Sequence, residues 1–296
     1  MIERKPLTIF LIIAFAISSA LFLLPLGFKS DAVMYQRMVL ICWSLGMWGP
    51  GIAAIIATRL VAKLPFSSLR LNTLGPKRFY LWAWFLPVVI AIVSGLLTVL
   101  FGIAKFDPNL TLIRNLMANT AGVQNIDPLI VILAQSAIAV LLAPFFNMLF
   151  ALGEEIGWRG FLLPRLEPLG QWKAILVSGL VWGIWHAPTI AQGQNYPDYP
   201  IAGIFMMIVF CILLGTIFAW LYFNTRSPWA TALAYGSVNA IAGLPIMFMK
   251  PGFNMAFGGT IATFPAWIVM AVFIGWLVWS KRLPVLRQVN ETVASE

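Results

Sequence analysis

Apolar runs of about 20 residues recur along this chain of 296 residues, and they constrain its fold more than any other feature. In lipid, every backbone amide must be hydrogen-bonded within the protein, so only helices and closed barrels can span a membrane. The runs lack the alternation of apolar and polar residues that barrel strands show. Hydrophobic residues make up 61% of the chain and charged residues 10%, whereas a soluble domain has about 25% charged residues. We therefore predict an all-α, polytopic membrane bundle.

The lengths of these runs predict about eight transmembrane helices, which we expect to form a single bundle over residues 1–296. The first run is longer than the apolar part of a usual signal peptide, about 7–15 residues, which favours a retained anchor. Each of the others is also near the length that a bilayer requires. The expected spans are 7–27, 38–61, 79–103, 129–152, 172–190, 201–223, 228–248 and 261–280.

The basic residues predict the orientation of these spans. The formal net charge is +9, but the Lys and Arg residues fall in short loops, which is typical of membrane orientation rather than of nucleic-acid binding. If the N-terminus is inside, all of the 19 Lys and Arg residues lie on the inner side except Lys29, Arg37, Lys105, Arg114 and Lys250. We therefore expect an integral protein of the cell membrane that contacts lipids, binds no nucleic acid, and has both termini in the cytoplasm.

A charged heptapeptide, residues 153–159, stands at the end of the fourth expected span. An ionised group at membrane depth costs roughly 2.5–3.5 kcal/mol, which makes such a group a candidate for function. Neighbouring helical residues point about 100° apart, so Glu154 and Glu155 face different directions. Glu155 lies one turn from Arg159, which is the spacing of a helical ion pair. Glu154 is then the carboxylate that is free to act as a general base.

The only histidine of the chain, His186, lies in the next apolar run. Trp182 precedes it by one turn and is expected to pack against the imidazole, and Pro188 is expected to disturb or end the helix. A glutamate and a histidine that share a water molecule form a general acid–base pair. We therefore predict that His186 works together with Glu154.

A third polar motif lies on the seventh expected span. Tyr235 and Asn239 are four residues apart and so share one helix face. Both side chains donate hydrogen bonds, and donors aimed at one point can stabilise an oxyanion. This motif is the candidate oxyanion-binding element.

Each of these motifs also has a purely structural interpretation. Both glutamates could pair with Arg159 and Arg165 near the interface. His186 could be a hydrogen-bonded group of the core. Tyr235 and Asn239 could make ordinary hydrogen bonds between helices, as polar residues in membrane proteins do.

Taken together, the three motifs resemble those of the CAAX prenyl endopeptidase and bacteriocin-processing family of intramembrane proteases. The resemblance covers about residues 129–248, and bacterial members of this family are often described as self-immunity proteins. Two positions differ from the family's usual pattern, with Trp182 in place of Phe and Tyr235 in place of His. The resemblance rests on the motifs Glu154-Glu155-x-x-x-Arg159, Trp182-x-x-x-His186 and Tyr235-x-x-x-Asn239.

The resemblance implies an endopeptidase that hydrolyses a membrane-associated or lipidated peptide near the membrane. Glu154 would be the catalytic glutamate, and His186 would help it to activate water. Asn239 and Tyr235 would occupy the oxyanion-binding positions, but a phenol lacks the positive charge of an imidazolium, and loss of an oxyanion donor costs about 10²–10³ in rate. The alternative is a non-catalytic family member that serves self-immunity or regulation. Supporting roles are implied for Glu155, Arg159 and Trp182.

The sequence disfavours the other hydrolytic chemistries of membranes. One histidine cannot supply the His-Glu-x-x-His motif of zinc proteases, and catalytic zinc usually has three protein ligands, so we expect no metal and no other cofactor. No Gly-x-Ser-x-Gly motif is present. The candidate acids of an aspartyl pair, Asp107, Asp127 and Asp198, fall in expected outer loops. A transporter is disfavoured because the sequence has no inverted repeat.

The expected spans leave the two main candidate residues at different depths. In straight helices Glu154 lies near the inner surface, whereas His186 lies about 20 Å deeper. Either Pro144 breaks the fourth helix and shifts Glu154 deeper, or the connector 160–172 dips into the bundle, which is permitted where protein covers it. The sequence leaves both explanations open.

Overall fold

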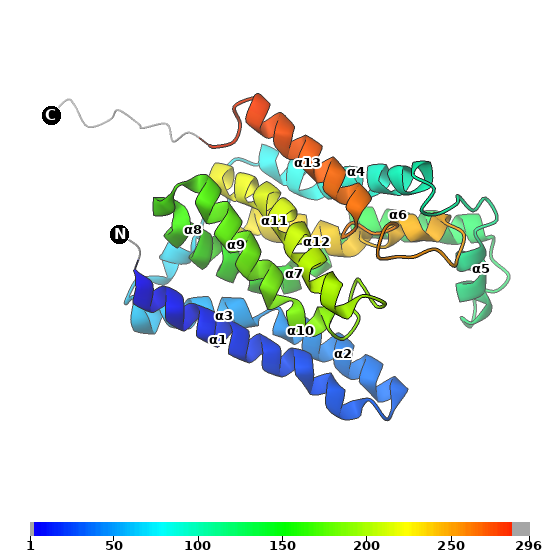
Figure 1. Cartoon of the computed structure of the whole chain (residues 1–296), viewed down its shortest axis with the longest axis horizontal. Helices are drawn as coiled ribbons and strands as arrows, with labels where there is room; N and C mark the ends of the chain where they lie inside the picture. Colours follow the sequence, from blue (N-terminus) through cyan, green and yellow to red (C-terminus); the bar gives the residue numbers. More distant parts are fainter. Residues whose placement is uncertain (1–2, 286–296) are drawn as a thin grey trace.

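The computed structural model describes residues 3–285, and its regular elements are helices. Figure 1 shows them in three layers. The helices α1, α2 and α3 form one side, α4 and α13 form the opposite side, and α7, α9, α11 and α12 lie between them. The bounds are α1 (Arg4–Leu23), α2 (Ala32–Gly46), α3 (Gly49–Ile56), α4 (Arg78–Leu100), α5 (Thr111–Ala118), α6 (Pro128–Leu141), α7 (Ala143–Glu155), the π-helical turn η4 (Ile156–Leu162), α8 (Leu163–Leu166), α9 (Gln171–Trp185), α10 (Ala187–Ile190), α11 (Pro200–Thr225), α12 (Pro228–Ile241), the 3₁₀ turn η6 (Leu244–Phe248) and α13 (Phe264–Trp279).

Five helical segments in the described part of the chain are long and apolar enough to cross a membrane, and a bent pair of helices makes a sixth. The chain is therefore an all-helical membrane protein with five to six candidate spans, against the eight expected. The two remaining expected spans are shorter than about 20 residues, since 172–190 is divided at His186 and 261–280 becomes helical only at Phe264. The candidate spans are Arg4–Phe28, Ala32–Val61, Arg78–Leu100, Pro200–Thr225, Pro228–Phe248 and the bent pair Pro128–Leu141 with Ala143–Leu169.

The bent pair has an identifiable cause. Its two helices meet at an angle of 46°, just before Pro144. Proline has no N–H, so it cannot bond the carbonyl four residues earlier, which is that of Val140. The indole Nε1 of Trp84 on α4 donates to this carbonyl at 2.6 Å. The break is therefore satisfied by a side chain from a neighbouring helix, as backbone groups at membrane depth require.

The helix that follows the break runs further than the sequence predicts. It continues through η4 and α8 to Leu169, so Glu154 lies in the middle of a helical segment and not at the end of a span. Arg159, which was expected on the inner side, is only 2% exposed. The expected end of the span at residue 152 was wrong, because Glu155 pairs with Arg159 and a paired charge need not end a buried helix. The side of the membrane on which Arg159 lies stays a prediction.

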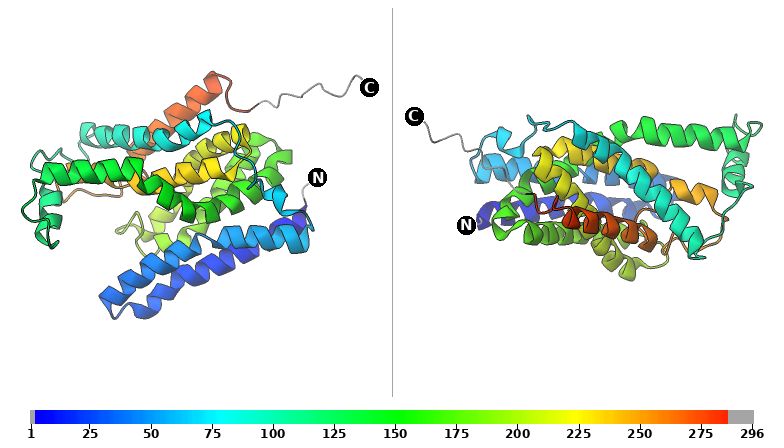
Figure 2. Two further views of the ribbon diagram at one scale, coloured as in Figure 1. Left: turned by 180° about the vertical axis from the view of Figure 1, so that it is seen from behind. Right: turned by 90° about the horizontal axis from the view of Figure 1, so that it is seen from above.

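Glycines allow the central helices to approach closely. A Cβ on Gly153 of α7 would lie 2.7 Å from the Cα of Trp48, and one on Gly236 of α12 would overlap the carbonyl of Pro144. Small residues at such crossings are typical of membrane helices. Figure 2 shows the resulting order from two further sides, with the pair α1 and α2 running together along one face. The packing fixes α7 between α3 and α12.

Candidate active site

Glu154 is buried and accepts hydrogen bonds from three side chains. The indole Nε1 of Trp182 donates to its Oε2 at 2.7 Å, and that of Trp158 donates to the same oxygen at 3.3 Å. The hydroxyl of Tyr235 donates to Oε1 at 3.2 Å. These donors come from α9, η4 and α12, so three separate segments fix the orientation of one carboxylate.

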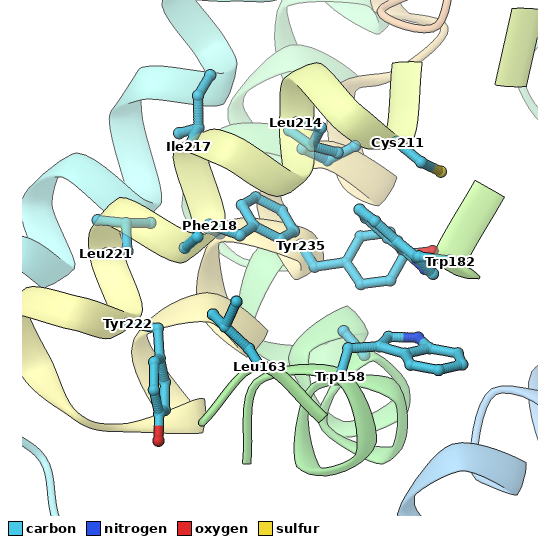
Figure 3. Packing of buried hydrophobic residues seen from close by; sticks show 14 of the residues in the cluster. Trp158, Leu163, Trp182, Cys211, Leu214, Ile217, Phe218, Leu221, Tyr222 and Tyr235 are labelled. Atoms are coloured by element: carbon cyan, nitrogen blue, oxygen red, sulfur yellow. The ribbon is translucent and has the colours of Figure 1, made fainter. Parts of the chain in front are cut away.

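The packing around this carboxylate is aromatic. The rings of Trp182 and Tyr235 meet edge to face with centroids 5.4 Å apart, and Phe218 of α11 lies against both. Figure 3 shows Trp182 beside Tyr235, with Trp158 on the neighbouring segment. Such edge contacts add roughly 0.5–1.5 kcal/mol beyond the burial of the rings. The three donors are thus held in place by their own packing.

His186 occupies the junction between α9 and α10, where Pro188 in the first turn of α10 lacks the N–H that a continuous helix needs. Its Nδ1 lies 2.9 Å from the carbonyl oxygen of Trp182. A carbonyl only accepts, so Nδ1 carries the proton, and Nε2 of the neutral ring is left as an acceptor. The Sγ of Cys211 lies 3.8 Å from Nδ1. Trp182 therefore links the two candidate residues, through its indole to Glu154 and through its carbonyl to His186.

One cavity of about 350 Å³ is lined by all four residues that the sequence singled out for catalysis: Glu154, His186, Tyr235 and Asn239. The structure contains elements of both explanations for their depths, because residues 160–163 of the connector are buried and the helix bends just before Pro144. Because the helix bends there and continues past residue 159, Glu154 reaches the cavity that His186 lines. The four predicted residues thus line one cavity, and their catalytic roles stay predictions, whereas the predicted helix end was wrong.

The cavity has a mouth beside α2. Asn239 is exposed, and it also lines a neighbouring hollow together with Leu40, Ser44 and Met47 of the α2 region. The same four residues border the main cavity. The carboxamide of Asn239 thus stands where the cavity opens, whereas Glu154 lies at its buried end.

A buried ion pair supports the site from behind. Arg159 Nη1 lies 2.5 Å from Glu155 Oε1, as the spacing of four residues predicts, and both side chains are almost fully buried. The guanidinium stacks over the ring of Trp182 at 4.4 Å and over that of Phe218 at 4.9 Å. A cation over an aromatic face is attracted by the ring quadrupole. The pair therefore braces the indole that donates to Glu154.

The sequence prediction missed two features of the site. Trp158 was not identified as a donor, although its position four residues after Glu154 places both on one helix face. Tyr235 was expected to face an oxyanion, but in the structure its hydroxyl donates to Glu154. The oxyanion role of Tyr235 stays a prediction. Within residues 3–285 no three His, Cys, Asp or Glu side chains gather closely enough to hold a metal ion.

Comparisons with known proteins agree with the resemblance of the motifs. Residues 131–241 match the family model of Rce1-like type II CAAX prenyl endopeptidases. A stretch of 53 residues is 36% identical to CAAX prenyl protease 2 of Methanococcus maripaludis, and it covers 18% of this chain and 20% of that protein. The alignment thus spans about a fifth of this relative. Neither description mentions self-immunity, so that interpretation gains no support.

The four candidate catalytic residues, Glu154, His186, Tyr235 and Asn239, fall within the matched range. On this match, residues 131–241 of the chain are similar to the Rce1-like type II CAAX prenyl endopeptidase family.

Proposed function

We propose that this protein is an intramembrane endopeptidase that uses a water molecule activated by Glu154 and His186. The observation that carries the proposal is the convergence of a carboxylate, an imidazole, a phenol and a carboxamide on one cavity. A nucleophile-activating base, its partner and an oxyanion donor that surround one space are the parts that peptide hydrolysis needs.

The reaction follows from the roles that these atoms can take. Glu154 accepts a proton from water while the water oxygen bonds to the scissile carbonyl carbon. Nε2 of His186, which is free to accept because Nδ1 is bonded to a carbonyl, orients the same water. Asn239 donates to the oxyanion. The proton then passes from Glu154 to the leaving amine as the C–N bond breaks.

In this scheme Tyr235 orients the base. Its hydroxyl lies 3.2 Å from Glu154 Oε1, so it contributes to the oxyanion only if it turns away from the carboxylate. The substrate class is a membrane-associated or lipidated peptide, which is supported by the family's description and by the exposed apolar side chains Leu40, Ile41 and Leu45 beside the mouth of the cavity.

The test uses purified full-length protein in lipid vesicles and a fluorogenic peptide with a lipidated C-terminal segment. Glu154→Gln and His186→Ala should each lower kcat by about 10²–10⁴, the usual contribution of an acid–base group. Asn224→Ala is the matched control, because Asn224 lies on α11, does not line the cavity, and donates to the carbonyl of Trp220 on its own helix. Cleavage by both site variants at the wild-type rate would refute the proposed roles.

A second candidate function is that of a non-catalytic family member. It is favoured because both carboxylate oxygens of Glu154 already accept hydrogen bonds from protein side chains. The donors are Trp182 and Tyr235, at positions where the family usually has Phe and His. Tyr235→His discriminates between the two. A large gain in cleavage points to a weakened enzyme, whereas no cleavage by either form favours a regulatory role.

We also propose that α9 with α10, and α13, complete eight crossings in one bundle, with both termini in the cytoplasm. The inner bias of Lys and Arg supports this topology. In it the loop around Asp198 faces outward, whereas a chain in which α9 does not cross would turn that loop inward. An impermeant maleimide applied to intact cells should label Asp198→Cys and not Lys63→Cys. The native cysteines, Cys42 and Cys211, are buried.

A further inference from the structure

A second cavity lies on the other side of α12 from the candidate active site. It holds about 230 Å³ and is lined almost wholly by apolar atoms. We call it the α4 pocket. Its walls come from the C-terminal half of α4, from the end of α12 and from η6. They include Gly95, Leu96, Val99, Ile241, Leu244 and Phe248.

The α4 pocket faces the lipid. Ile92 and Leu96 on its rim are 56% and 66% exposed, and both belong to α4, a candidate membrane span. An apolar cavity on a membrane-facing surface cannot hold ordered water, because its walls offer no hydrogen bonds. Its contents are therefore apolar, and the surrounding medium supplies long hydrocarbon chains.

Two lysines adjoin the end of this pocket. Phe106 and Met249 line the pocket and form a short antiparallel bridge. Their neighbours Lys105 and Lys250 are exposed and are joined by a backbone hydrogen bond of 2.8 Å. The pocket therefore ends beside two positive charges, as the hydrocarbon of a bilayer ends at its headgroups.

Three basic residues are grouped beside this pocket. Only five Lys and Arg residues are expected on the side away from the termini, and three of them, Lys105, Lys250 and Arg114 of α5, lie in the segments next to the pocket. The usual bias of membrane proteins disfavours basic residues on that side, so their grouping beside an apolar pocket calls for a ligand.

The nearest acidic group does not cancel these charges. Asp107 accepts hydrogen bonds from the backbone N–H groups of Thr111 and Asn109, at 2.7 and 3.1 Å, and so caps the start of α5. Its pKa is lowered chiefly by the bonds to Thr111, with a smaller contribution from Lys250. Asp127 similarly caps α6 through the N–H of Leu129. Both carboxylates are engaged, and the positive charges outnumber Asp107.

We propose that the α4 pocket is a binding site for an anionic phospholipid, with one acyl chain in the pocket and the phosphate held by Lys105 and Lys250. The pocket supplies the apolar contact and the lysines supply charge complementarity. The proposal does not depend on peptidase activity, because none of these residues lines the cavity of Glu154.

The test uses the full-length protein in detergent micelles and phospholipids with a photoactivatable diazirine in the acyl chain. Phosphatidylglycerol should label peptides of α4 and η6 at lower concentration than phosphatidylcholine does. In the double variant Lys105→Gln and Lys250→Gln, the phosphatidylglycerol concentration that gives half-maximal labelling should rise about 25-fold. Each basic residue near an anionic headgroup contributes roughly a factor of five in affinity. Lys29→Gln with Arg37→Gln is the matched control, because both are exposed residues expected on the same side of the membrane.

A second pair of variants tests the apolar part of the site. Val99→Trp fills the pocket and should abolish labelling by both lipids. Leu100→Trp, at the next residue and outside the pocket, should leave labelling unchanged. The proposal would be overturned if the two lipids reached half-maximal labelling at the same concentration, or if Val99→Trp were labelled as strongly as the wild type. If Val99→Trp does not fold, the double lysine variant still decides, because its side chains are exposed.

Discussion

The two cavities beside α12 differ in almost every physical respect, although Ile241 and Ala242, which line different ones, are neighbours in the sequence. The cavity of Glu154 contains polar groups that are hydrogen-bonded to specific partners, such as Glu154 to Tyr235 and His186 to the carbonyl of Trp182. The α4 pocket is lined by groups that need none. In the first, the position of each atom matters, whereas in the second only shape and apolarity matter. Equal substitutions on the two sides should therefore have unequal effects.

The largest effect is expected behind the active-site cavity. Arg159→Leu leaves Glu155 buried without its cation, and breaking a buried pair in this way destabilises by about 3–5 kcal/mol. Thermal unfolding in detergent measures it. Arg226 and Glu167 form a matched pair that is more exposed, with side chains 27% and 15% accessible, so Arg226→Leu should cost less. An equal loss of stability in the two variants would mean that the burial of an ion pair does not determine the cost of breaking it.

A smaller effect is expected from the strongest donor to Glu154. Trp182→Phe removes the N–H that lies 2.7 Å from Oε2, and leaving a buried carboxylate short of a donor costs about 1–3 kcal/mol. Stability and kcat should both fall. Trp185→Phe is the control, since Trp185 also lines the cavity but its buried Nε1 has no hydrogen-bond partner among the described residues. Similar losses in the two variants would show that ring volume, and not the donated bond, matters.

Tyr235→Phe should have a more modest effect, because its hydrogen bond to Glu154 is longer, at 3.2 Å, and a typical bond contributes about 0.5–1.5 kcal/mol. If the hydroxyl orients the base, kcat falls while KM stays near the wild-type value. Steady-state kinetics with the lipidated peptide separates the two constants. A change confined to KM would instead indicate that the phenol contacts the substrate.

The smallest effect is expected on the other side of α12. Leu96→Ala trims an exposed residue of the α4 pocket, and such surface changes usually stay within about 0.5 kcal/mol. Peptide cleavage should be unchanged in detergent without added phospholipid. A large loss of activity would break the comparison, because it would mean that the two faces of α12 are coupled.

The sequence predicts the helical membrane fold and the residues of the site because both depend on local features. Apolar length identifies membrane helices, and spacings of four residues correctly pair Glu155 with Arg159. The motif residues Glu154 and His186 also meet at one cavity as the resemblance implies. Their catalytic roles stay predictions.

Other features depend on partners that are distant in the sequence. The fourth span was ended too early because the apolar run stops at the charged heptapeptide, whereas in the fold Arg159 is paired with Glu155 and stacked on Trp182, so the helix continues. The direction of the Tyr235 hydroxyl depends on how α12 packs on α7, with Gly236 against Pro144. No local pattern contains that information. Apolar composition also does not show that a helix stops at His186 or begins at Phe264, so two of the eight expected spans contain helices shorter than a candidate span requires.

The bond from Trp84 to Val140 has a consequence for the order of assembly. Synthesis proceeds from the N-terminus, so α4 enters the membrane before the α6–α7 segment is made. The indole of Trp84 is then already present when the carbonyl left unpaired by Pro144 arrives. A chain that lost this indole would insert a bare carbonyl into hydrocarbon. The bend that places Glu154 at its cavity is thus stabilised by α4, a helix that is synthesised earlier.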